Sequence, residues 1–365
     1  MSILDTGIKN VKNVDSFNFG FNSILELDNT LEKFRKSKCS TLFFIDKFFN
    51  QNKNLDNLFK IMEYDHVIYV ETAVEPTTQY IDHLYNDIKH LDCEISSIVS
   101  IGGGITLDIG KAISNLYTNK GCAADYQGWD LVKEPGLFKI GIPTISGTGS
   151  EATRTCVMTN KENGLKLGMN SDFTVFDKII LDPNLTKTVP RDQYFYTGMD
   201  AYIHCVEAIN GSYRNAVGDA FSRETLKLCE EVFNSNDMMS DKNREKLMVA
   251  SYLGGASIAT SYVGVVHPFS AGLSVVLGTH HCEANCIVMN VMDEYYSEEC
   301  KNYKKMLKKQ NIKLKKNICK DLTNAQYDML YESTIIHEKP LTNALGEEFK
   351  QILNKEKVIN LFKRM

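Results

Sequence analysis

A carboxylate and an imidazole lie four residues apart in the segment 196–207, at Asp200 and His204. In a helix, positions i and i+4 lie on one face about 5–6 Å apart, so both side chains could bind one metal ion. A single pair of this kind is more often an ordinary surface hydrogen bond. The pair therefore indicates a metal site only if further ligands can be found.

Two further histidines, His267 and His281, lie in the segment 247–282, which contains no Asp, Glu, Lys or Arg. Ionisable side chains are costly to bury unless they are paired or bound to something. One carboxylate and three neutral imidazoles would complete the protein ligands of a divalent cation. Such nitrogen and oxygen ligands suit Fe(II), Zn(II), Mn(II) or Co(II), and the sequence does not choose among them. The predicted metal ligands are Asp200, His204, His267 and His281.

The uncharged segment 247–282 is long enough to cross a membrane. However, its glycines, Pro268 and three histidines are more typical of buried helices that line a site, so we expect no membrane span. Two cysteines are next to predicted ligands, Cys205 and Cys282. We expect both to be core thiols that point away from the ion.

Two glycine-rich turns follow predicted strands. The first contains Gly102, Gly103 and Gly104 and leads into a helical pattern with Asp108 and Lys111. Glycines allow backbone N–H groups to approach phosphate oxygens closely at the start of a helix. The turn does not match the dinucleotide fingerprint GxGxxG, and many such turns bind nothing.

The second turn, residues 143–151, contains two glycines and three hydroxyl side chains, among them Thr144 and Thr148. Hydroxyl groups suit a pyrophosphate or a nicotinamide amide, and ligands of parallel sheets bind beyond the carboxyl ends of adjacent strands. Asp46, which follows another predicted strand, could accept hydrogen bonds from a ribose. Alternatively, it is only a turn residue.

The first half of the chain alternates between strand and helix patterns. Largely apolar runs at 41–45, 66–70, 95–101 and 138–142 are typical of strands covered on both faces, and a helix is expected to begin near Thr77. This order predicts an α/β domain, residues 1–183, with a mostly parallel Rossmann-like sheet. Residues 165–181 could form a hairpin. Residues 184–365 are predicted to form an all-α domain, with helices near 192–210, 213–234, 242–262, 284–297 and 322–334.

The composition excludes several classes of protein. The chain has 365 residues, a net charge of −5 and 43% hydrophobic residues, as in ordinary folded domains rather than disordered ones. A mildly acidic balance argues against nucleic-acid binding. Ten cysteines without CxxC spacing predict reduced thiols, and the N-terminus shows no export signal, so we expect a cytoplasmic protein.

Taken together, these motifs resemble the iron-containing (group III) alcohol dehydrogenases along the whole chain. The residues that carry the resemblance are Gly102–Gly104 with Asp108 and Lys111, the turn 143–151, Asp182 with Pro183, Asp200 with His204, and His267 with His281. The resemblance implies a dehydroquinate synthase-like fold, with a dinucleotide-binding domain followed by a helical domain. It also implies a homodimer.

The resemblance assigns roles to individual residues. It implies that Asp200, His204, His267 and His281 bind Fe2+ or Zn2+. It also implies an NAD(P) cleft formed by Asp46, Gly102, Gly103, Gly104, Asp108, Thr144, Thr148 and Lys166.

Four segments, 125–129, 168–172, 191–196 and 272–276, resemble the 3-deoxy-D-manno-octulosonate (Kdo) 8-oxidase branch of that family. This resemblance implies oxidation of the C8 primary alcohol of the sugar acid Kdo to an aldehyde, with O2 as acceptor. It implies a PLP-dependent aminotransferase as functional partner, which makes 8-amino-3,8-dideoxy-Kdo for lipopolysaccharide. Arg154 and Arg191 are candidates to bind the substrate carboxylate, or else form structural pairs.

Two residues depart from the family pattern. Ile105 occupies a position where the wider family usually has Ser, which removes a phosphate contact and argues against ordinary NAD(P) use. Ala271 occupies a position where many relatives have another His, so the alcohol proton would need His280 or a water molecule instead. The alternatives are an NAD(P)-dependent dehydrogenase of another small alcohol or polyol, a dehydroquinate synthase-like lyase, and a non-catalytic relative. The lyase would require phosphate-binding basic residues near the metal, a pattern that we do not find.

Overall fold

The computed structural model describes residues 11–35, 39–52 and 55–365. These residues form two compact units, of which one comprises Lys12–Thr188 and the other contains Val189–Met365. The division falls between residues 188 and 189, whereas the sequence predicted a boundary between 183 and 184. Residues 1–10, where an export signal would begin, lie outside the described residues.

The first unit is built around a six-stranded sheet in the order β1-β9-β6-β4-β2-β3, in which every pair of neighbours is parallel. The predicted runs 41–45, 66–70, 95–101 and 138–142 all form strands of this sheet. The described strands of this unit are β1 (Ser16–Phe19), β2 (Cys39–Asp46), β3 (His66–Val70), β4 (Glu94–Gly102), β5 (Gly128–Trp129), β6 (Phe138–Pro143), β7 (Thr155–Asn160), β8 (Leu165–Asn170) and β9 (Lys178–Leu181). Its helices are α1 (Leu27–Leu31), α2 (Lys47–Asn52), α3 (Thr78–Ile88) and α4 (Gly104–Thr118).

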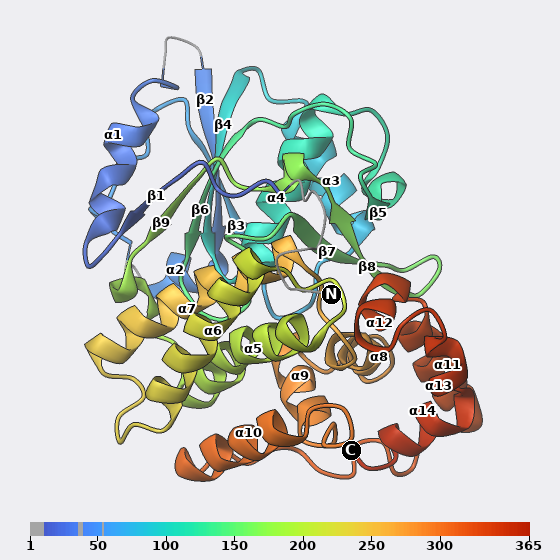
Figure 1. Ribbon diagram of the computed structural model, residues 1–365. Helices are drawn as coiled ribbons and strands as arrows, with labels where there is room; N and C mark the ends of the chain where they lie inside the picture. The colour runs from blue at the N-terminus through green and yellow to red at the C-terminus, as the bar shows by residue number, and fades with distance from the viewer. Residues whose placement is uncertain (1–10, 36–38, 53–54) are drawn as a thin grey trace. The chain divides into compact units, whose positions relative to one another are not determined.

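Helices cover both faces of this sheet, which explains why β2 is apolar at successive positions (Figure 1). Leu42 and Phe44 pack in one cluster with α3 and α4, while Phe43 and Ile45 pack in another with α1. Side chains of a strand alternate between its two faces, so a strand covered on both sides needs a continuous apolar run. Helix α3 begins where predicted, because the Thr77 side chain accepts a hydrogen bond from the Tyr80 backbone N–H at 3.1 Å.

The predicted hairpin over residues 165–181 is wrong. Strand β8 instead pairs antiparallel with β7 in a separate three-stranded sheet, while β9 joins the large sheet beside β6 and β1. The turn between β7 and β8 contains Gly164, whose φ of 70° is favourable for glycine. The short strands on either side of this turn therefore form the hairpin, and the more apolar β9 is buried in the main sheet.

The second unit is helical, as predicted. Its described helices are α5 (Arg191–Asn210), α6 (Ala216–Phe233), α7 (Asp241–Thr260), α8 (Val266–Leu277), α9 (His281–Met289), α10 (Ser297–Lys309), α11 (Asn324–Ile335), α12 (Glu338–Leu345), α13 (Phe349–Ile352) and α14 (Lys355–Phe362). The predicted helix 284–297 is wrong at both ends, because α9 starts earlier and ends at Met289. The apolar residues Val291, Met292 and Tyr296 continue the helical spacing of apolar residues. They are buried, but they lie in a turn and not in a helix.

The uncharged segment 247–282 forms the later part of α7, all of α8 and the beginning of α9. Glycines interrupt it, and Gly278 ends α8 in the left-handed conformation with φ 65°. Among the residues that the structure describes, we find no helix with the length and apolarity to cross a membrane.

A buried lysine of helix α4 forms hydrogen bonds with the segment 150–155, which leads into β7. The ammonium group of Lys111 is fully buried and donates to the Thr155 carbonyl at 2.9 Å, the Thr153 carbonyl at 3.1 Å and the Ser150 hydroxyl at 3.2 Å. Burial lowers the pKa of Lys111 and raises the pKa of its neighbour Asp108. The opposite charges of Lys111 and Asp108, 3.9 Å apart, thus offset part of the cost of burying each other.

We predict that Lys111→Met will destabilise the protein by about 3–5 kcal/mol, because it leaves the largely buried Asp108 without its cation and the carbonyls of Thr153 and Thr155 without their donor. The matched control is Lys47→Met, which removes an ion pair with Glu71 in which both side chains are half exposed. Urea denaturation should give a large fall in midpoint for Lys111→Met and little change for the control. Equal midpoints for the two variants would contradict the structural role of Lys111.

Candidate metal centre and nucleotide-binding turns

Helix α5 carries two of the predicted ligands, Asp200 and His204, into the core of the helical unit. Asp200 is fully buried and His204 is 4% exposed, between apolar neighbours such as Met199 and Ile203. The helical spacing places Nε2 of His204 3.6 Å from Oδ1 of Asp200. The pair is therefore an interior arrangement and not the surface hydrogen bond considered as the alternative.

Helices α8 and α9 bring the other two predicted ligands to the same carboxylate. Nε2 of His267 lies 3.4 Å from Asp200 Oδ1, and Nε2 of His281 lies 3.7 Å from Asp200 Oδ2. Donor atoms of Asp200, His267 and His281 all lie within 4.8 Å of one another. The ring of His204 stacks on the ring of His267, with centroids 4.7 Å apart. The structure thus brings all four predicted ligands together.

The protonation of these groups is set by burial and by their mutual contacts. Burial alone would raise the pKa of Asp200, but the neighbouring His204, His281 and His267 hold it well below its ordinary value. Burial lowers the pKa of His204 to about 4, so this imidazole is neutral near pH 7. Burial also acts to lower the pKa of His267, but the Glu207 and Asp200 carboxylates raise it to about 9.

Two residues of this site were missed by the sequence analysis, Glu207 and Asn285. The Glu207 carboxylate is fully buried and contacts Nδ1 of His267. Asn285 donates from Nδ2 to Asp200 Oδ1 at 2.6 Å and lies within 3.3 Å of Nε2 of both His267 and His281. A helical signal was present, since Glu207 follows Asp200 by seven residues and Asn285 follows His281 by four.

The donor set fits a divalent metal ion. A carboxylate and three imidazoles are ligands that Fe2+ and Zn2+ accept. Donor atoms of Asp200, His267 and His281 lie within 4.8 Å of one another, and Nε2 of His204 lies 3.6 Å from Asp200 Oδ1. Because Glu207 lies against Nδ1 of His267, Nε2 is the nitrogen that faces Asp200. Contacts of this kind orient the histidine ligands of metals in proteins.

The two cysteines next to ligands behave differently. Cys205 is fully buried beside Thr225, Ser222 and Ser257, away from the ligands as predicted. The prediction for Cys282 is wrong, because its thiol lies 3.6 Å from Asp200 Oδ2. Helix α9 begins at His281, and the first turn of this helix presents both residues to the carboxylate.

His280, the predicted proton-relay residue, immediately precedes α9 and is exposed. Ala271 is buried one turn after His267 on α8. A methyl group at this position can neither donate nor accept a proton. The role of His280 stays a prediction.

The predicted nucleotide residues lie in the first unit, at the carboxyl ends of adjacent strands. The chain passes from β2 to β3 on one side and then to β4 on the other side of β2, so the topology reverses between β2 and β4. Ligands of open parallel sheets bind at such a point. Register pairs Ile45 with Ile101 and Gly102 with Pro143, which aligns Asp46, the glycine triplet and the turn 143–151.

The glycine triplet is closely packed at the start of α4. A Cβ atom on Gly102 would lie 2.5 Å from Oγ1 of Thr106, and one on Gly104 would lie 3.2 Å from Oγ1 of Thr148. A larger residue at Gly104 would therefore displace one turn from the other, and one at Gly102 would clash with α4. The beginning of a helix of 15 residues, approached closely through glycine, fits the phosphates of a dinucleotide.

Other residues predicted for the nucleotide are engaged with the protein itself. Asp108 accepts hydrogen bonds from the Ser150 hydroxyl at 2.5 Å and from the Val157 backbone N–H at 2.9 Å. Lys166 forms an ion pair of 3.2 Å with Glu75. Asp46 accepts from the backbone N–H of Phe48 at 3.0 Å, as a turn residue does. These contacts indicate that Asp108 positions the turns rather than contacting a ligand.

The two arginines considered for substrate binding form structural pairs. Arg154 pairs with Asp130 and, at 3.2 Å, with Asp172. Arg191 donates to the Gln310 carbonyl at 2.7 Å. Both therefore fit the structural alternative.

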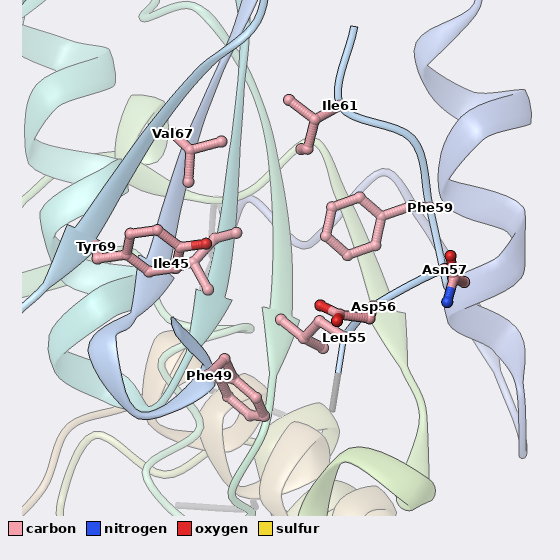
Figure 2. A pocket seen from close by; sticks show the side chains of 9 residues that line it. All are labelled: Ile45, Phe49, Leu55, Asp56, Asn57, Phe59, Ile61, Val67 and Tyr69. Carbon is pink, nitrogen blue, oxygen red and sulfur yellow. The ribbon is translucent and has the colours of Figure 1, made fainter. Parts of the chain in front are cut away.

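A cavity of about 310 Å³ lies in the first unit between β2, β3 and the segment 55–61 (Figure 2). Most of its lining residues are apolar or aromatic, and two polar side chains, Asp56 and Asn57, lie on the segment 55–61. The lining residues are Ile45, Phe49, Leu55, Asp56, Asn57, Phe59, Ile61, Val67 and Tyr69. None of the predicted metal or nucleotide residues is among them.

Comparison with known proteins identifies the family. The model of the family "Iron-containing alcohol dehydrogenase" matches residues 15–183, and that of "Fe-containing alcohol dehydrogenase family, C-terminal" matches residues 194–347. The chain belongs to the iron-containing alcohol dehydrogenase family. The predicted family and fold class are thus confirmed.

Individual relatives agree with this assignment. The chain is 30% identical to 4-hydroxybutyrate dehydrogenase of Clostridium kluyveri over 73% of this chain and 72% of that protein. It is 34% identical to sulfoacetaldehyde reductase of Bilophila wadsworthia, over 57% of this chain and 54% of that protein. Several other relatives are likewise matched over little more than half of their length.

A solved structure shares the fold of this protein. The structure of sulfoacetaldehyde reductase from Bifidobacterium kashiwanohense in complex with NAD+ superimposes with a TM-score of 0.78 and 20% identity. The superposition covers 98% of both chains.

We predict that His281→Ala keeps the fold but loses stoichiometric metal, because one of four ligand groups disappears. The matched control is His280→Ala, which removes the adjacent exposed imidazole and should keep one metal per chain. Metal content by plasma mass spectrometry and helicity by circular dichroism would check both. A full metal content in His281→Ala would exclude this residue as a ligand.

Proposed function

We propose that this protein is a metal-dependent oxidoreductase that converts a primary alcohol to an aldehyde. The observation that carries the proposal is the fully buried Asp200 carboxylate, with imidazole nitrogens of three histidines 3.4–3.7 Å from its oxygens. Family membership supports the same class of reaction.

The residues of the helical unit would hold the ion and shield it from water. A divalent cation bound there would supply Lewis acidity, which lowers the pKa of an alcohol hydroxyl near it. Asp200 would contribute the negative charge, and His204, His267 and His281 would contribute nitrogen donors, with His267 giving up its second proton when the ion binds. Since Asp200 and His204 are buried, the charges interact in surroundings of low polarity, where preorganised groups act most strongly.

The glycine turns of the first unit support a dinucleotide as one acceptor of the hydride. In this proposal, backbone N–H groups at the start of α4 bind the pyrophosphate, and Thr144 and Thr148 supply hydroxyl groups. One relative is named NAD-dependent methanol dehydrogenase, and the similar sulfoacetaldehyde reductase structure was solved with NAD+. Both favour NAD(P) as the hydride acceptor. Ile105 follows the glycine triplet and lacks the hydroxyl group that would contact a phosphate. Its presence favours O2 as the acceptor instead.

For the substrate we propose the C8 alcohol of Kdo, on the basis of the resemblance of four segments to the Kdo 8-oxidase branch. The names of two relatives describe small acids with a terminal alcohol or aldehyde, which is compatible with an acid sugar. An aminotransferase that consumes the aldehyde, and a homodimer, belong to the same proposal. The alternative is an NAD(P)-dependent dehydrogenase of another small alcohol or polyol.

The test is turnover of Kdo by protein loaded with Fe(II) or Zn(II), with and without O2 and with and without NAD(P). We expect O2-dependent formation of an aldehyde that an added amine traps at C8. Asp200→Asn serves as the control and should lose at least 100-fold in kcat. Activity that requires NAD(P) and ignores O2 would reject the oxidase and keep the dehydrogenase. No oxidation of Kdo or of other primary alcohols by metal-loaded protein would reject the proposal.

A further inference from the structure

Glu207 lies behind His267, on the side of the ring opposite to Asp200. Its carboxylate is fully buried, and its Oε2 contacts Nδ1 of His267. Its other oxygen, Oε1, accepts the backbone N–H of Val266 at 2.5 Å. Both oxygens of this buried carboxylate thus face the first two residues of α8.

We propose that Glu207 is a positioning residue that fixes the tautomer and the orientation of His267. An ionised carboxylate can only accept hydrogen bonds, so Nδ1 of His267 must carry the hydrogen that Glu207 accepts. In the neutral imidazole the other nitrogen, Nε2, then has the free lone pair. This nitrogen lies 3.4 Å from Asp200 Oδ1, on the side of the proposed metal. The inference rests on the metal-binding function proposed above.

The start of α8 gives His267 little freedom to adopt another orientation. Helix α8 begins at Val266, and Val265 before it offers no side-chain cap. Glu207 supplies an acceptor for Val266, and the Tyr296 hydroxyl accepts the backbone N–H of Val265 at 3.2 Å. His267 is therefore the second residue of a helix whose first turn is held by side chains from α5 and from the segment before α10.

A purely structural role is the competing explanation, in which Glu207 only anchors the first turn of α8. Tyr296 provides the comparison, because its hydroxyl anchors the same turn through the backbone N–H of Val265. Tyr296→Phe removes that acceptor and keeps the Glu207 carboxylate against Nδ1 of His267. Glu207→Gln is nearly isosteric and can still accept the Val266 N–H through its amide oxygen, but its NH2 group then faces Nδ1. The hydrogen of the neutral ring would move to Nε2, which could no longer bind a metal.

The experiment measures Zn(II) affinity of the full-length metal-free protein by titration against a competing chelator. We expect Glu207→Gln to weaken Zn(II) binding about 10–100-fold, the usual range for groups that orient metal-binding histidines. Tyr296→Phe should bind Zn(II) as the unmodified protein does. Glu207→Asp restores an acceptor-only carboxylate and should recover part of the lost affinity. Unchanged affinity in Glu207→Gln, or an equal loss in Tyr296→Phe, would overturn the inference.

A second measurement needs neither metal nor activity. Nitrogen chemical shifts of 15N-labelled His267 at alkaline pH distinguish the two neutral tautomers. We expect the hydrogen on Nδ1 in the unmodified protein and on Nε2 in Glu207→Gln. The same tautomer in both would overturn the inference even if Glu207→Gln lost affinity through misfolding. Should the unmodified protein bind no Zn(II) or Fe(II), the proposed function would fail, whereas the tautomer measurement would still decide the role of Glu207.

Discussion

Burial of one carboxylate, Asp200, is the constraint on which the helical unit depends. Removing a carboxylate from water costs several kcal/mol unless nearby donors or cations compensate. Asp200 is fully buried, and its oxygens face three imidazoles and the amide of Asn285. The helices α5, α8 and α9 must therefore converge, since each carries at least one group that the carboxylate requires.

The first unit follows a different physical rule. Its parallel strands are covered on both faces, so polar groups that bind ligands can gather only where strands end. The ends of β2, β4 and β6 are neighbours, and Asp46, the glycine triplet and the turn 143–151 follow them. Asp108 and Lys111 tie these turns together from within α4. The proposed metal centre therefore lies in one unit and the proposed nucleotide-binding turns lie in the other.

The sequence predicted those features that local patterns determine. Continuous apolar runs identified four strands, and β3 matches its predicted range of 66–70. Histidines in an uncharged segment pointed to the cluster around Asp200, because burying them requires a partner; their role as metal ligands stays a prediction. The spacing of Glu207 from Asp200 places it on the same helix face, but its partner His267 is 60 residues away, so the sequence does not show what Glu207 contacts. Cys282 was misplaced because the orientation of its thiol depends on where α9 begins, which tertiary packing decides. The hairpin was misplaced because tertiary packing decides which strands pair, and the more apolar β9 joins the main sheet.

The central claim is that four side chains of the helical unit bind one metal ion. The most direct test is an X-ray structure of Fe(II)- or Zn(II)-loaded crystals, with anomalous difference maps on both sides of the metal absorption edge. The account predicts one strong peak per chain, at bonding distance of about 2.0–2.2 Å from Asp200, His204, His267 and His281. An anomalous peak elsewhere, or none in a chain that solution measurements show to be loaded, would contradict it.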